Sequence, residues 1–380
     1  MEIIEKGLKK FNKFQMKKPF MFLFFVLVFT LVMGYSATNI YFSSDFMDQL
    51  PQDIDAIQSS EMLYDKIGGS DHVVVLLEAD VSEEGIKDIR DPEAVESIFK
   101  LHRELEDEPL IDNVESVASF FGDGNIPDGK EGVKRVLSQV EGTDNLFNKQ
   151  YTATMVEITA NIPDDEVSIQ EFNEDVEENV EQVGGPYNLD GVLTGTTPLR
   201  VEILGYLESD MMVTTLWASV LIYLFISLVK KSFKWGAAIF VPLLFGLTWT
   251  LGTIAIIDIP VTIATVMVGP MILGMAVEYG SFAVERYKEE VSETPTLDEV
   301  RDGLNGSIPY VGASMTGSAT TATAGFLALL IATFPMIEDL GIFLALGIIN
   351  SLLSALVVSP LLIFSIEYTS LFFRGGGESD

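Results

Sequence analysis

Long uncharged apolar runs constrain this chain of 380 residues more than any other feature of its sequence. A helix needs about 20 mostly apolar residues to cross a lipid bilayer. Runs near this length occur at the start of the chain and again after Asp210. We therefore predict an α-helical membrane bundle of six transmembrane helices, at Phe20 to about Tyr35, Met211–Val229, Gly236–Ile257, Val261 to about Ala283 with a kink at Pro270, Val311–Phe334 and Leu340–Ile366.

Lysine and arginine set the predicted orientation. Six lysines precede the first apolar run, and the other basic clusters fall on the same side if the runs alternate. Both termini are therefore expected in the cytoplasm of a multi-pass protein of the cell (plasma) membrane, with the segment between the first two runs outside. The first run also fits a cleaved signal peptide, because it is short and is followed by the small residues Ser36 and Ala37.

The external segment is strongly acidic. About 40 of the 56 Asp and Glu lie between Tyr41 and Asp210, so most of the net charge of −33 belongs there. Such a surface repels nucleic acid, which we exclude as a partner. The acidity fits a solvated face suited to a salty medium, or a surface that collects cations.

The chain offers little for catalysis or metal binding. It contains no cysteine, which rules out disulfides and thiolate zinc sites, and its only histidines are His72 and His102. It also lacks a Gly-rich phosphate loop and a nucleophile–base arrangement. We therefore expect no metal, no cofactor and no enzymatic activity.

Strand and helix patterns alternate within the acidic segment. The order suggests two β-α-β units separated by an irregular insertion at Gly122–Gln150, and thus an external α+β ferredoxin-like domain between transmembrane helices 1 and 2. Strands are expected at Asp71–Asp80, Val114–Phe121, Thr152–Ile162 and Tyr187–Gly195, and helices at Asp91–Asp107, at Asp164–Val183 and from Pro198.

The predicted domains follow from these patterns. They are a cytoplasmic basic N-terminus (1–19), transmembrane helix 1 (20–36), the external domain (37–210), transmembrane helices 2–6 (211–366) and a cytoplasmic C-terminal tail (367–380).

A glutamate, Glu278, interrupts the fourth apolar run. Its helix neighbours at i−4 and i+3 are Gly274 and Ser281, so its face is small and polar and should look into the bundle. An apolar environment favours the neutral form of a carboxyl group, so Glu278 could release a proton or cation when its surroundings change. The alternative is a boundary glutamate that reaches water, because Arg286 follows after about 12 Å of helix rise.

Hydroxyl groups crowd the fifth run. They are predicted to act as relay partners of Glu278, together with an amide in the sixth run and the tyrosine that follows the glutamate. The alternative is that the hydroxyls only allow close helix packing or bond to their own helix, and that the tyrosine only packs. The residues concerned are Tyr279, Thr316, Ser318, Thr320, Thr321 and Asn350.

Several stretches resemble a known transporter family when they are taken in order. The chain is similar to one half of a resistance-nodulation-division (RND) superfamily transporter, and most similar to its branch of hydrophobe/amphiphile exporters and mycobacterial-lipid (MMPL-like) exporters. The resemblance rests on LPQDIDAIQSSEMLYDKIGGSDHVVVLLEAD, GVLTGTTPL, GMAVEYGSFAVERYKEE, TTATAGFLALL and LGIFLALGIINSLLSALVVSPLLI.

The resemblance implies a transporter of hydrophobic or amphiphilic molecules such as lipids, driven by a gradient of H⁺ or Na⁺, with H⁺ favoured. The external domain would be its porter domain. The family's fourth span usually carries a proton-relay aspartate followed by tyrosine, which corresponds to Glu278 and Tyr279 here. Glutamate keeps the carboxylate but adds a methylene. Because members commonly contain two such halves, the resemblance also implies a homodimer.

Two alternatives remain at this point. The chain also resembles a SecD/SecF-like accessory subunit of protein translocation, although it lacks the Gly-rich element that follows that family's first span. A non-transporting lipid sensor or scaffold could use the same fold, since fold does not fix function.

Overall fold

The computed structural model describes residues 2–44, 49–51, 54, 57–58, 71–79, 88–122, 124–140, 146–163, 165–184, 189–292 and 294–375. The chain forms two compact units. One comprises Met1–Pro51 and Tyr206–Asp380, and the other Gln52–Gly205. Most of the stretch from Leu50 to Ser70, which contributes to the family resemblance, lies outside the described residues.

The unit Gln52–Gly205 contains a four-stranded antiparallel sheet in the order β2-β3-β1-β4. Its elements follow one another as β-α-β-β-α-β, and the sequence patterns placed all of them within a few residues except β2. Their bounds are β1 Asp71–Ala79, α4 Pro92–Glu106, β2 Ile111–Glu115, β3 Ala153–Ala160, α6 Glu166–Gly184 and β4 Leu189–Gly195.

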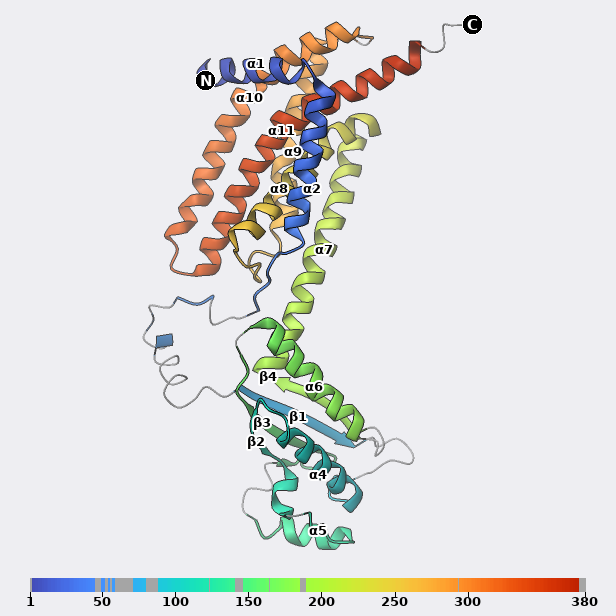
Figure 1. Cartoon of the computed structure of the whole chain (residues 1–380), viewed down its shortest axis with the longest axis vertical. Helices are drawn as coiled ribbons and strands as arrows, with labels where there is room; N and C mark the ends of the chain where they lie inside the picture. The colour runs from blue at the N-terminus through green and yellow to red at the C-terminus, as the bar shows by residue number, and fades with distance from the viewer. Residues whose placement is uncertain are drawn as a thin grey trace. The chain divides into compact units, whose positions relative to one another are not determined.

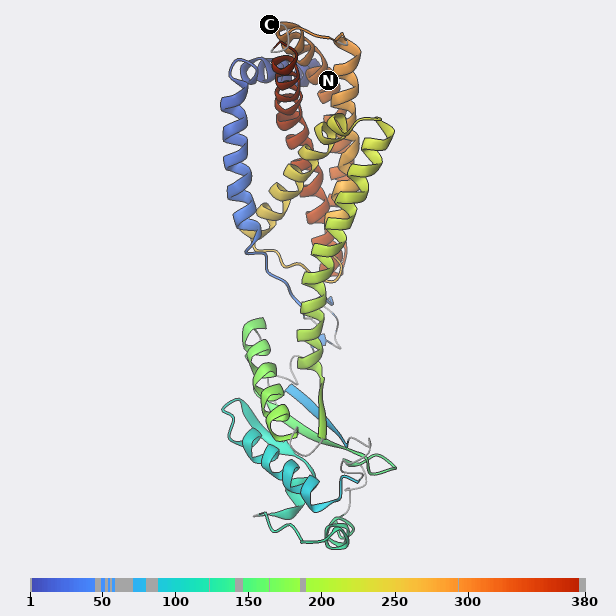
Figure 2. The ribbon, with the colours of Figure 1, turned by 90° about the vertical axis from the view of Figure 1, so that its right-hand side faces the viewer.

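Helices α4 and α6 lie side by side on one face of this sheet (Figures 1 and 2). Alternation along β1 explains this, because Val73, Val75 and Leu77 are buried while Glu78 points the other way. The buried residues pack against Ile98 of α4 and against the apolar side of α6. A single core therefore holds the sheet and both helices together.

The stretch Val114–Phe121, predicted as one strand, is a strand only up to Glu115. Ser116 ends it by capping a short 3₁₀ helix, η1 Val117–Phe121, where its Oγ accepts a hydrogen bond from the Ala118 N–H at 3.0 Å. The apolar side chains of η1 then pack with helix α5, Lys130–Leu137, in a small second core. The insertion after Gly122 is thus partly helical.

The other unit is a helical bundle, whose elements are drawn in Figures 1 and 2. They are α1 Glu2–Gln15, α2 Pro19–Ala37, α7 Thr196–Val229 (which begins in the other unit), α8 Phe233–Ile257, α9 Val268–Glu290, α10 Leu297–Leu327, the 3₁₀ turn η4 Ala328–Ile331 and α11 Pro335–Gly375. Five of these segments are long and apolar enough to cross a membrane, namely α2, α7, α8, α10 with η4, and α11. The sequence predicted six. The helix that falls short is α9, because charged residues crowd its second half.

Helix α9 nevertheless lies inside the bundle, in contact with α8, α10 and α11. Ile272, Leu273 and Ala276 are among its fully or nearly fully buried residues. Helices α2 and α7 lie outside, and their large apolar side chains, such as Leu221 and Phe225, are exposed as expected for residues that face lipid.

Candidate functional site

Helix α9 carries the candidate ion-binding residue, and its start differs from the prediction. The segment Val261–Met267, expected to be helical, forms turns in which the Thr262 N–H donates to Thr265 Oγ1 at 2.8 Å. Pro270 therefore lies in the first turn of α9 instead of kinking a longer helix. A proline is tolerated there because first-turn N–H groups have no helical partner.

Glu278 lies two turns further along α9 and contacts α10. Its Oε1 accepts a hydrogen bond from Ser318 Oγ at 3.3 Å, and both side chains are exposed on the surface of this chain. The prediction that Glu278 looks into its own bundle is wrong. The apolar side of α9, with Ile272 and Ala276, takes the interior, which leaves the small polar side on the outer surface.

The other predicted relay residues do not gather at Glu278 in this arrangement. Tyr279 is buried in the bundle core and is 2% exposed. Asn350 is half-buried on α11. The hydroxyls of Thr316, Thr320 and Thr321 each donate to the backbone carbonyl four residues earlier in α10. Among the predicted partners, Ser318 is the one that the structure joins directly to the carboxylate.

Glycines mark the same outer face of α9 and α10. A Cβ atom placed on Gly274, Gly317 or Gly325 would meet no atom within 4 Å. Other glycines in these helices are packed tightly, and a Cβ on Gly280, for example, would lie 2.7 Å from the Ile239 carbonyl oxygen. Sequence reasoning did not single out the three open glycines as a group, although Gly274 was recognised as a neighbour of Glu278.

Ion pairs surround the charged end of α9. Lys230 of α7 pairs with Glu285 of α9, and Lys234 of α8 pairs with Glu367 of α11 at 3.2 Å. Arg286 pairs with glutamates one turn further along α9, at 2.9 Å. The sequence treated these charges only as a membrane boundary. Spacing could have revealed the pairs within α9, but no local signal links residues of different helices.

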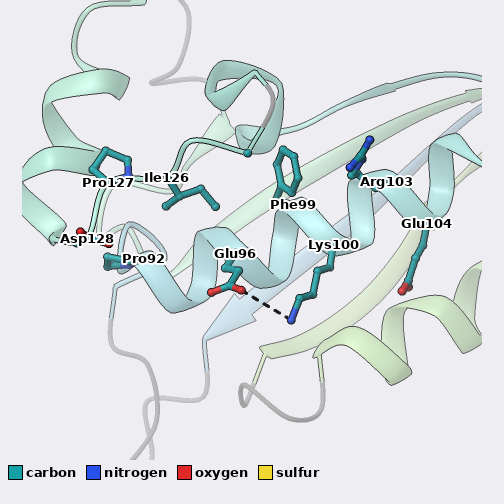
Figure 3. Close-up of a pocket in the computed structure, with 10 residues that line it drawn as sticks. Pro92, Glu96, Phe99, Lys100, Arg103, Glu104, Ile126, Pro127 and Asp128 are labelled. Atoms are coloured by element: carbon teal, nitrogen blue, oxygen red, sulfur yellow. Dashed lines mark ion pairs between the residues drawn. The ribbon is translucent and has the colours of Figure 1, made fainter.

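The unit Gln52–Gly205 contains an open hollow of about 600 Å³, shown in Figure 3. It lies between α4 and the segment Gly124–Asp128. Phe99, Ile126 and Pro127 supply its apolar surface, while Lys100, Arg103 and several carboxylates stand around it. Lys100 is 3.9 Å from Glu96 on the same helix. Among the residues described, no group of three or more His, Cys, Asp or Glu side chains could hold a metal ion.

Five helices that are long and apolar enough to cross a lipid bilayer indicate that this chain is a membrane protein. Comparison with known proteins agrees. A profile of the MMPL family matches residues 47–367, so the chain belongs to the MMPL family. The RND resemblance is thereby confirmed.

A curated relative also covers nearly the whole chain. It is a protein of Methanocaldococcus jannaschii that is named, provisionally, as a membrane protein. The two chains are 30% identical over 373 residues, which are 95% of this chain and 94% of the relative. Family membership indicates a membrane transporter of hydrophobic substances.

Proposed function

We propose that this protein is an ion-gradient-driven transporter of hydrophobic or amphiphilic molecules such as lipids, and that Glu278 binds the coupling ion. The observation that carries the proposal is the contact between Glu278 of α9 and Ser318 of α10, which lies beside the open glycines Gly274 and Gly317. An acidic residue within a membrane-spanning helix is costly unless it has a partner and a task. H⁺ is the favoured ion and Na⁺ the alternative.

In this proposal α9 is the sixth transmembrane helix. Apart from Glu278, its charges begin at Glu285 and lie in its last two turns, where the helix would return to the membrane boundary. The β-α-β-β-α-β order and the strand order support a ferredoxin-like porter domain over residues 37–210. Segments 1–19 and 367–380 would be cytoplasmic, and the porter domain would lie outside the cell.

The working unit would be a homodimer. The outer face with Glu278, Ser318 and the three open glycines is polar and small, which suits a second helix pair better than lipid. A two-fold axis along the membrane normal would bring two copies of this face together and would remove both glutamates from lipid. Neutralisation of Glu278 would then change how the two copies pack, and so couple the ion to helix movement.

The decisive experiment replaces Glu278 by glutamine, which keeps size and hydrogen bonding but cannot ionise. Wild type, Glu278→Gln and the matched control Glu285→Gln are reconstituted in liposomes. Tryptophan fluorescence from Trp217, Trp235 and Trp249 is then recorded while pH and Na⁺ are varied. We expect a transition in wild type and in the control that is lost in Glu278→Gln.

The ion that moves the transition identifies the coupling ion. An equal response in all three proteins would reject Glu278 as the coupling residue and would favour a lipid sensor or scaffold. A transition that requires a translocating polypeptide instead would favour the SecD/SecF-like alternative.

A further inference from the structure

Helix α1 presents three different faces, and one of them is fixed to the bundle by polar side chains. Asn12 Nδ2 donates to the Leu304 carbonyl of α10 at 3.0 Å. Gln15 Nε2 donates to the Val357 carbonyl of α11 at 2.7 Å. Both amide side chains are buried, with exposures of 2% and 0%. These hydrogen bonds therefore hold the helix against the first part of α10 and the middle of α11.

The two acceptor carbonyls each precede a proline. Leu304 lies just over one turn before Pro309, and Val357 just under one turn before Pro360. A proline within a helix leaves the carbonyl four residues earlier without a helical donor, here that of Asn305 or Leu356, and Leu304 and Val357 are the neighbours of these residues. Because α1 uses amides for docking, most of its large apolar residues are not needed for that contact.

Those apolar residues form the second face. Ile3 is 86% exposed, Phe11 40% and Phe14 60%. At 100° per residue these side chains fall within one sector of the helix, together with Ile4. The third face carries the exposed lysines Lys6, Lys9, Lys10 and Lys13. Lys6 pairs with Glu2 on the same helix, and Lys9, Lys10 and Lys13 form no ion pair with a described residue.

The short connection between α1 and α2 indicates that the apolar face and the lysine face of α1 lie next to the lipid bilayer. Helix α2, which is apolar throughout and long enough to cross a membrane, begins at Pro19, only a few residues after α1 ends at Gln15. The last turn of α1 must therefore lie close to the bilayer boundary. A helix with phenylalanines on one side and lysines on the next is suited to lie in the head-group layer of an anionic leaflet.

We infer that α1 is an interfacial lipid-binding element, which inserts Phe11 and Phe14 below the head groups and binds anionic head groups with its lysines. This surface is separate from the Glu278 face and does not depend on transport. It would tie α10 and α11 to the membrane surface through Asn12 and Gln15.

The absence of cysteine from the chain makes a direct test simple. Single-cysteine variants Phe14→Cys and Lys9→Cys of the full chain carry an environment-sensitive fluorophore. Each is reconstituted in vesicles of phosphatidylcholine alone or of phosphatidylcholine with phosphatidylglycerol. Quenching is measured with lipid-attached nitroxide and with aqueous acrylamide.

We expect the probe at position 14 to be quenched mainly by the lipid nitroxide, and the probe at position 9 mainly by acrylamide. Lipid quenching at position 14 should increase when phosphatidylglycerol is present. Combined replacement of Lys6, Lys10 and Lys13 by glutamine should abolish that increase, whereas Lys134→Gln and Lys149→Gln, in the other unit, should leave it unchanged.

Equal acrylamide quenching at positions 14 and 9 would overturn the inference that α1 inserts into the membrane. Lipid quenching that is the same in both vesicle types would overturn recognition of anionic head groups. Circular dichroism and elution volume of each variant show that it is folded, so a loss of quenching cannot be attributed to misfolding.

Discussion

At the scale of single residues, Asp88 is a carboxylate that contacts two cations in the unit Gln52–Gly205. Its carboxylate accepts hydrogen bonds from the Arg90 side chain at 2.9 and 2.8 Å, and lies 3.0 Å from Lys130 Nζ. Arg90 also lies over the Tyr151 ring, 3.4 Å from its centroid. Burial raises the pKa of Asp88, but the bonds from Arg90 and Lys130 outweigh it and hold the pKa well below 3.8.

We predict that Asp88→Asn destabilises this unit by about 2 kcal/mol at neutral pH, because it leaves two partly buried cations without their carboxylate. Glu131→Gln, a change to an exposed glutamate on α5, should cost less than about 0.5 kcal/mol. Urea unfolding of the full chain, followed by hydrogen exchange of α5, measures both. Folding lowers the pKa of Asp88. The stabilisation by its ionised carboxylate should therefore be complete above pH 3.8 and be lost as the pH falls through the lowered pKa. Equal effects of the two variants would contradict this prediction.

The environment of His102 leads to a prediction about stability at a pH closer to neutral than the range in which Asp88 acts. Burial lowers the pKa of this side chain, although Glu106 acts in the opposite direction. Its Nδ1 lies 3.1 Å from Ser116 Oγ, so the neutral ring fits the site. As the pH falls, His102 is therefore protonated at a higher pH in the unfolded chain than in the folded chain. The free energy of unfolding should decrease as the pH drops below about 6.5, the usual pKa of a histidine.

Thermal unfolding of wild type and His102→Gln at pH 7.5 and pH 5.5 tests this. The wild type should lose stability between the two values, and the variant, which lacks the titrating ring, should lose less. An identical loss in both would assign the pH dependence to other groups.

At the scale of helices, the contrast between open and packed glycines gives a paired prediction. Gly274→Leu should leave the bundle folded, because space lies beyond this residue, but should prevent association of two copies. Gly280→Leu should disrupt the bundle itself, because the new side chain would collide with the Ile239 backbone.

Mass photometry in detergent gives the oligomeric state, and thermal unfolding gives the stability. If Gly274→Leu remains fully dimeric, the α9 and α10 face is not the interface. If Gly280→Leu is as stable as wild type, the packing at Ile239 has been overestimated.

Sequence patterns predicted where the helices lie along the chain better than they predicted which side of each helix contacts its neighbours. The apolar runs located the ends of α2 and α8 to within about three residues, because length and composition define such helices, whereas α11 extends beyond its apolar run at both ends. The runs misplaced the start of α9, since a proline in the first turn and one inside a helix look alike. They also missed α1, whose lysines suggested only an orientation signal.

The same limit applies to the candidate site. A glutamate in an apolar run was recognisable, as was the hydroxyl-rich helix that contacts it. Which hydroxyl would reach the carboxylate depended on how α9 and α10 are rotated, and packing at residues such as Gly280 and Gly312 sets that rotation. No spacing within one helix encodes it.

At the scale of the whole molecule, the charge distribution leads to a prediction about salt. Because acidic residues greatly outnumber basic ones between Tyr41 and Asp210, that unit repels itself at low ionic strength. We predict that its melting temperature increases between 10 mM and 500 mM salt, where the screening length falls from about 30 Å to a few ångströms. NaCl and choline chloride should act equally if screening is the cause. A larger effect of Na⁺ would instead favour a surface that collects cations.

The internal hydrogen bonds of α10 have a mechanical consequence. Thr316, Thr320 and Thr321 donate to carbonyls of their own helix, so these hydroxyls need no acceptor on a neighbour. A helix that satisfies its polar groups in this way can slide or rotate against an adjoining surface without breaking bonds at each step. Movement of α10 against a neighbouring helix would therefore break few hydrogen bonds, and the bond between Ser318 and Glu278 is one that it would break.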